Sequence, residues 1–138
     1  MGTSRAESIL LRAVLGLIAA PLVLYFIWGL YMSLPVRWIH INSGHAGVFD
    51  MGETRESIIA RLPHESFSPQ PKPPECPRNW IGVSDMTATE KNCLLSSDVW
   101  IEGASSMRSQ CPYLDMETTL RFRSNRLASV TTTCRHGF

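Results

Sequence analysis

Residues 116–134 read METTLRFRSNRLASVTTTC, and this stretch decides the predicted fold. From 116 to 123, apolar or threonine side chains alternate with charged or polar ones, which is the period of a strand buried on one face. The Ser-Asn pair that follows fits a two-residue turn, because asparagine tolerates the positive φ that tight hairpins need. The β-branched run 127–134 returns as a second strand. We therefore predict an antiparallel hairpin whose far end a cysteine can fasten.

Shorter segments upstream indicate two further strands and one helix. Residues 80–83 (WIGV) form a short apolar run, and residues 98–102 (DVWIE) alternate in the manner of a strand. A helix is predicted between the candidate N-cap Thr54 and Pro63, which ends it. In chain order, these elements predict an α+β domain in which a short helix packs on an antiparallel meander of three or four strands.

Two segments are harder to assign. Residues 36–42 alternate apolar and polar side chains, and they either continue a helix or begin a strand. Residues 63–77 contain six of the nine prolines, which excludes a helix interior or a central strand. We expect a long ordered loop tied down by Cys76. A polyproline ligand at residues 71–74 is the alternative.

A run of twenty uncharged residues, 13–32, lies near the N-terminus. At about 1.5 Å per residue, a helix of this length crosses a hydrocarbon core of roughly 30 Å. A cleaved signal peptide is the alternative, but its apolar region is shorter and ends at a small-x-small site, whereas bulky residues follow this run. Arg5 and Arg12 precede the run and only Arg37 follows closely, which favours a cytoplasmic N-terminus.

All four cysteines follow the apolar run, and an even number in a small exported domain predicts two disulfides. They are Cys76, Cys93, Cys111 and Cys134. Three pairings are open, and no C-x-x-C spacing favours zinc or redox chemistry. Because disulfides need an oxidising compartment, the part of the chain that carries the cysteines should be exported. Together with the apolar run, this predicts a single-pass protein of the inner (plasma) membrane. Its parts are a cytoplasmic segment (1–12), a transmembrane anchor (13–34) and a periplasmic or extracellular α+β domain (35–138).

Net charge gives little indication of a partner. The 138 residues carry a formal net charge of +1, and the part after the anchor holds 11 basic and 11 acidic residues, which does not favour nucleic-acid binding. The densest basic group is Arg121, Arg123 and Arg126, of which the first two should point from one strand face. We predict that these arginines bind a partner, together with Trp80 and Trp100. The alternatives are a solvated sheet face for the arginines and a place in the core for the tryptophans.

No motif of known catalytic chemistry is present. The nucleophile elbow, the phosphate loop and the dinucleotide fingerprint are all absent from the sequence. His40, His45, His64 and His136 are scattered, and no pair has the H-x-x-x-H spacing of a helical metal site. We therefore predict no catalytic residue, no metal, no cofactor and no small-molecule substrate. An enzyme with an unrecognised site is the least favoured alternative.

Two segments carry a resemblance to a known family. Residues 52–63 (GETRESIIARLP) resemble the capped helix, and residues 120–127 (LRFRSNRL) the final hairpin, of the small outer-membrane lipoproteins that include the E subunit of the β-barrel assembly machinery. The β-lactamase inhibitor proteins are built from similar units with disulfides. The resemblance implies a periplasmic protein-binding or assembly module rather than an enzyme.

The tether, the disulfides and the absent chemistry together favour a protein partner in the periplasm. One form of this hypothesis is an immunity or inhibitor protein that neutralises a toxin or enzyme there. The alternative is a single-pass accessory or assembly subunit of a larger membrane or envelope complex, in which the membrane helix itself binds.

Overall fold

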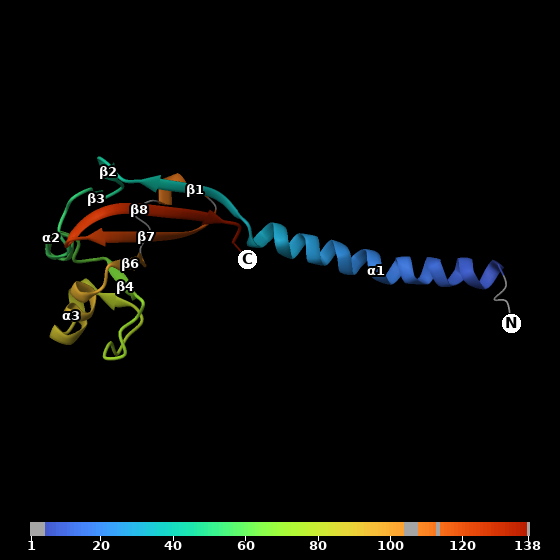
Figure 1. Ribbon diagram of the computed structural model, residues 1–138, viewed down its shortest axis with the longest axis horizontal. Coiled ribbons are helices and arrows are strands. Elements are labelled where there is room, and N and C mark those ends of the chain that lie inside the picture. The colour runs from blue at the N-terminus through green and yellow to red at the C-terminus, as the bar shows by residue number, and fades with distance from the viewer. Residues whose placement is uncertain (1–4, 104–107, 113, 138) are drawn as a thin grey trace. The chain divides into compact units, whose positions relative to one another are not determined.

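A computed structural model of the chain describes residues 5–103, 108–112 and 114–137 (Figure 1). The chain divides into two compact units, with the boundary between Leu34 and Pro35.

Helix α1 (Arg5–Ser33) is long and apolar enough to cross a membrane. Its most apolar 18-residue window has a mean hydropathy of 2.3, and none of that window is buried inside the protein. The helix has 29 residues, whereas about 20 residues suffice for a hydrocarbon core. Pro21 lies inside it, as membrane helices tolerate.

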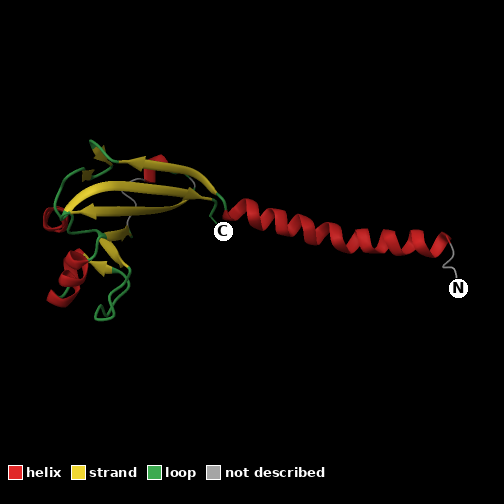
Figure 2. Ribbon diagram, in the orientation of Figure 1, coloured by secondary structure: helices red, strands yellow, loops and turns green. Residues whose placement is uncertain are grey.

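Among the described residues, the second unit is built on a six-stranded antiparallel sheet (Figure 2). The strands lie in the order β1-β8-β7-β6-β4-β5. Their bounds are β1 (Pro35–Ile41), β4 (Ser66–Gln70), β5 (Ile81–Gly82), β6 (Val99–Glu102), β7 (Asp115–Arg123) and β8 (Arg126–Arg135). The remaining elements are the paired strands β2 (His45–Ala46) and β3 (Phe49–Asp50), helices α2 (Arg55–Arg61) and α3 (Ala88–Ser96), and the 3₁₀ turns η1 (Val83–Asp85) and η2 (Arg108–Gln110). The predicted α+β class and antiparallel sheet are confirmed.

Strands β7 and β8 form the predicted hairpin. Ser124 and Asn125 have φ angles of 51° and 62°, so both central residues of the turn are in the left-handed region that matches the twist of the two strands. The choice between helix and strand that residues 36–42 left open is decided in favour of a strand, because β1 contains all of them but residue 42 and pairs with β8. The sheet therefore has more strands than the three or four predicted.

Strand β4 corrects the prediction that residues 63–77 are a loop. Four of its residues pair with β6, and Pro69 lies opposite Trp100. The proline is tolerated because β5 pairs only with Ser66 and Phe67, so Pro69 has a partner strand on one side only. A proline excludes two-sided pairing at its own position but not a strand that is an edge along part of its length.

Helix α3 is absent from the predicted elements, which include only strands after residue 80. Its N-terminus is a capping box, in which Glu90 N donates to Thr87 Oγ1 (3.2 Å) and Thr87 N donates to Glu90 Oε2 (2.9 Å). The buried side chains of α3 are Glu90, Cys93 and Leu94. Because one of the three is charged, the sequence shows no apolar stripe that would indicate a helix. By contrast, α2 is confirmed with Thr54 as its N-cap.

A row of aromatic rings forms the centre of the core. Ring centroids are 6.5 Å apart for Phe49 and Phe67, 5.1 Å for Phe67 and Trp100, and 4.5 Å for Trp100 and Phe122. Offset aromatic pairs at these distances contribute about 0.5–1.5 kcal/mol each beyond their buried area.

Two disulfides are present, as predicted, and the pairing is Cys76–Cys93 and Cys111–Cys134. The first joins the proline-rich segment to α3. The second joins the segment before β7 to the end of β8, so a cysteine does fasten the hairpin at its far end.

Candidate functional site

The strand register divides the side chains of the sheet between two faces. One row across five strands begins at half-buried Ile39 on β1 and continues through buried Thr132, Thr118, Glu102 and Phe67. The adjacent row, which alternation places on the other face, runs from exposed His40 through half-buried threonines to Ile101 and Ser68. We call this second face the open face. Its exposed or half-buried members include Trp38, His40, Val99, Ile101, Asp115, Glu117, Thr119, Arg121, Arg123, Arg126, Ser129, Thr131 and Arg135.

All three predicted arginines lie at one end of the open face. Arg121 pairs with Ser129 on β8 and with Val99 on β6, and Arg123 follows two residues later on β7. Arg126 is the direct partner of Arg123 across the hairpin. All three are exposed, whereas Phe122 and Leu127, on the opposite face, are buried. We call these three residues the arginine cluster.

The arginine cluster has no carboxylate partner within the part of the chain that the structure describes. Arg126 Nη1 donates to the carbonyl of Gly52 at 2.9 Å, which is a neutral acceptor. Because like charges directly opposite each other in an antiparallel pair destabilise it, Arg123 and Arg126 impose a small cost on the folded state. An anion bound there would remove that cost.

The two predicted tryptophans have different locations. Trp100 is fully buried, and its Nε1 donates to the Leu94 carbonyl at 2.9 Å, so it belongs to the core and not to a binding surface. Trp80 is 48% exposed, and its ring lies over Gly103, where an added Cβ would approach it to 3.1 Å. Trp38 on β1, 67% exposed, is an additional aromatic residue of the open face that the sequence reading did not select. The sequence could not indicate which face of the sheet Trp38 occupies, because residues 36–42 were compatible with both a helix and a strand.

A groove of about 450 Å³ adjoins the arginine cluster. Its apolar lining comes from Pro71, Pro73, Pro74 and Val99, and Lys72 and Asp98 also line it. Val99 on β6 is the direct cross-strand partner of Arg121 on β7, so the groove borders the cluster. We call it the proline groove; the sequence reading did not anticipate it.

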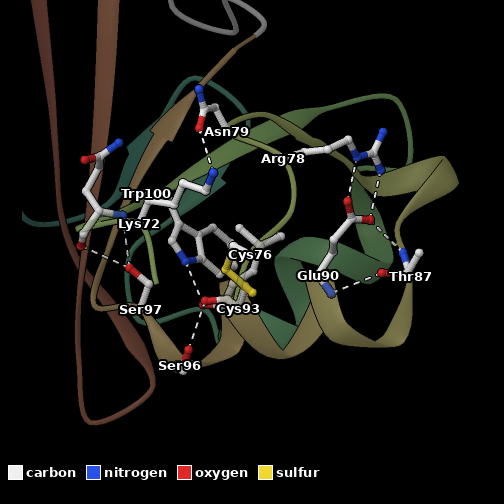
Figure 3. The surroundings of a disulfide bond; sticks show 12 residues. Lys72, Cys76, Arg78, Asn79, Thr87, Glu90, Cys93, Ser96, Ser97 and Trp100 are labelled. Carbon is white, nitrogen blue, oxygen red and sulfur yellow. Dashed lines mark hydrogen bonds and ion pairs between the residues drawn. A yellow bond between two sulfur atoms is a disulfide. The ribbon is translucent and has the colours of Figure 1, made fainter. Parts of the chain in front are cut away.

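Local contacts hold the walls of the proline groove (Figure 3). The Cys76–Cys93 disulfide joins the proline-rich segment to α3. Ser97 Oγ donates to the backbone carbonyl of Gln70 (3.1 Å) and accepts from the backbone N–H of Gln70 (3.2 Å). Lys72 Nζ donates to Asn79 Oδ1 at 3.0 Å. The groove is therefore shaped before any partner arrives.

An ion pair beside this disulfide supports α3. Arg78 Nε and Nη2 donate to the two carboxylate oxygens of Glu90 at 2.5 Å and 2.9 Å, and Arg78 Nη1 donates to Asp85 Oδ2 at 3.0 Å. The hydrogen bonds from Arg78, followed by the Thr87 amide, lower the pKa of Glu90 to about 2. Glu90 is therefore ionised at neutral pH, although its side chain is buried.

Arg55 positions the turn that carries the arginine cluster. Its side chain is buried and donates to the Ser97 carbonyl (3.0 Å), to Asn125 Oδ1 (2.8 Å) and to Asp98 Oδ1 (2.5 Å). Asn125 in turn donates to Glu56, which lowers the pKa of that carboxyl. The turn is thus fixed to α2 and to the start of β6.

The histidines lie in separate places. His40 Nδ1 is 2.9 Å from Thr131 Oγ1, and His45 is hydrogen-bonded to Asp50 across the β2–β3 ladder. His64 is exposed and His136 is half-buried. Over the described ranges, no group of three or more His, Cys, Asp or Glu side chains is arranged to hold a metal.

No protein-family model, curated protein or solved structure matches this chain. The resemblance to the small outer-membrane lipoproteins therefore stays a prediction.

Proposed function

We propose that this protein is a membrane-anchored, protein-binding module whose α+β domain lies in the periplasm and binds its partner through the open face. One observation carries the proposal: three exposed arginines lie on one face of the sheet without a carboxylate partner among the described residues. The rigid, disulfide-linked scaffold supports it, since a preformed surface loses little conformational entropy on binding.

An immunity or inhibitor protein is the form of this function that we favour. Such a protein blocks a toxin or enzyme by covering part of its surface, and it needs no catalytic group of its own. A face that crosses five strands offers the broad contact area that stable protein complexes use. The membrane anchor would keep the module where a periplasmic partner arrives.

Photo-crosslinking in native membranes tests the proposal. A photoreactive residue replaces Ser129, which lies on the open face beside Arg121, in the full-length chain. The control replaces Lys91, which is exposed on α3. We expect a protein crosslink from position 129 and little from position 91. Equal crosslinking from both positions, or none from 129, would contradict the proposal.

An accessory subunit that binds through its membrane helix is the second candidate function. Helix α1 has no buried side chain, and a shallow groove along it is lined by Tyr25, Phe26, Gly29, Leu30 and Ser33. A neighbouring membrane helix could pack there, since small residues permit close approach. Replacing residues 13–32 by an unrelated membrane helix separates the candidates. Retained crosslinking from position 129 favours the open face, and loss of the partner favours the helix.

A further inference from the structure

The arginine cluster and the proline groove form one continuous surface. Arg121 and Val99 are direct partners on adjacent strands, where side chains on the same face are about 5 Å apart. We infer that the two features together bind an acidic segment of the partner, with one large apolar side chain of that segment seated in the proline groove. This inference rests on the proposed function and specifies the chemistry of the partner.

Charge complementarity identifies the acidic component. Three carboxylates on segments that contact the end of the β7–β8 hairpin already have partners: Asp98 is paired with Arg55, Glu56 accepts from Asn125, and Glu53 is paired with Arg61. The cluster therefore keeps its positive charge and its hydrogen-bond donors for an external ligand. Guanidinium groups bind carboxylates through short, charge-assisted hydrogen bonds, often two at a time.

The proline groove identifies the apolar component. Three prolines and Val99 give it an apolar lining of fixed shape, and its volume accommodates a large side chain. Lys72 adds a further positive charge, because its Nζ is bonded only to the neutral amide oxygen of Asn79 among the described residues. Asp98, the one acidic residue of the lining, is already paired with Arg55.

A labelled synthetic peptide, Glu-Asp-Phe-Asp-Glu with blocked ends, is a direct probe. Its binding to the full-length chain in micelles of an uncharged detergent is measured by fluorescence anisotropy. We expect the double variant R121E/R123E to weaken binding at least tenfold. The matched control K91E/R108E reverses two exposed charges outside the sheet and should stay within twofold of the wild type. Equal binding by R121E/R123E and the wild type would overturn the inference.

Two further arms test the groove. Replacing the phenylalanine of the peptide by alanine should weaken binding several-fold, and S96W, which fills the groove from its α3 side, should remove that difference. A preference for phenylalanine that S96W leaves unchanged would contradict the groove as its seat. The alanine peptide measures the preference for phenylalanine on the unaltered protein, so that preference is established independently of the folding of S96W.

A final pair of measurements separates the ligand sources and the two proposals. Glycerol phosphate at matched ionic strength should displace the peptide poorly; displacement as effective as by unlabelled peptide would assign the cluster to phosphate headgroups and overturn the inference. If the peptide fails to bind while R121E/R123E abolishes the crosslink from position 129, the acidic segment is wrong and the proposed function stands. If the variant also leaves that crosslink unchanged, both are wrong.

Discussion

Replacing Arg55 by methionine tests how the domain positions its arginine cluster. The methionine keeps much of the aliphatic stem and removes the guanidinium. That group is buried, donates to Ser97, Asn125 and Asp98, and lies 4.8 Å above the centroid of the Phe122 ring. The substitution therefore disconnects α2 from the β7–β8 turn and from the start of β6.

The expected loss is about 3 kcal/mol. A hydrogen bond from a charged group to a buried carbonyl, here that of Ser97, contributes about 1.5–3 kcal/mol. The ion pair to Asp98 adds no more than about 1 kcal/mol because that side chain is 79% exposed. Stacking on Phe122 adds about 1 kcal/mol. In a domain of this size, the total corresponds to a fall in Tm of about 15 °C.

Urea unfolding of the full-length chain in micelles, followed by near-UV circular dichroism, measures this loss. The control K91M removes an exposed charge and should change the free energy of unfolding by less than about 0.5 kcal/mol. Arg55→Lys should recover only part of the loss, because lysine lacks the planar fork. A change below about 0.5 kcal/mol for R55M would refute the role assigned to Arg55.

Three further outcomes are expected. Because Arg78 lowers the pKa of Glu90 to about 2, the stabilisation from this pair is fully present above about pH 4.5 and is lost as the pH falls towards 2. Urea midpoints between pH 5 and 2 should therefore fall less steeply for E90Q than for the wild type, and parallel curves would contradict this. Removing the Cys76–Cys93 disulfide, which spans 17 residues, with the double serine variant should cost about 3 kcal/mol in the same assay; an unchanged midpoint would argue against its role. Alkaline phosphatase fused to the C-terminus should be active in intact cells, because the domain is predicted to be exported. An inactive phosphatase fusion, together with activity of a cytoplasmic reporter fused at the same position, would contradict the predicted topology.

Local patterns explain which elements could be predicted from the sequence. The β7–β8 hairpin was predictable because its alternation and its turn residues agree, and α2 because Thr54 and Pro63 mark its ends. Helix α3 lacks an apolar stripe, so only its Thr-x-x-Glu capping box marked it. Strand β4 was hidden because Pro69 is compatible with a strand only once the shortness of β5 is known.

The candidate site was predictable to a lesser degree, because part of it depends on contacts between distant segments. Alternation indicated the common face of Arg121 and Arg123, and the register extends it to Arg126. The proline groove joins residues 70–74 to residues 96–99, which the pairing of β4 with β6 brings together. The sequence predicted a loop at residues 63–77, so this pairing was not foreseen. Trp100 had two plausible roles, and only packing shows that it lies in the core.

Charge reversal in the arginine cluster is the most direct test of the central claim that the open face binds a protein partner. The measurement is the amount of partner recovered after crosslinking from position 129 in native membranes, compared among the wild type, R121E/R123E and K91E/R108E at equal expression. We predict at least a tenfold lower recovery with R121E/R123E and unchanged recovery with K91E/R108E, whose charges lie outside the sheet. Equal recovery from all three proteins would show that the open face does not bind the partner.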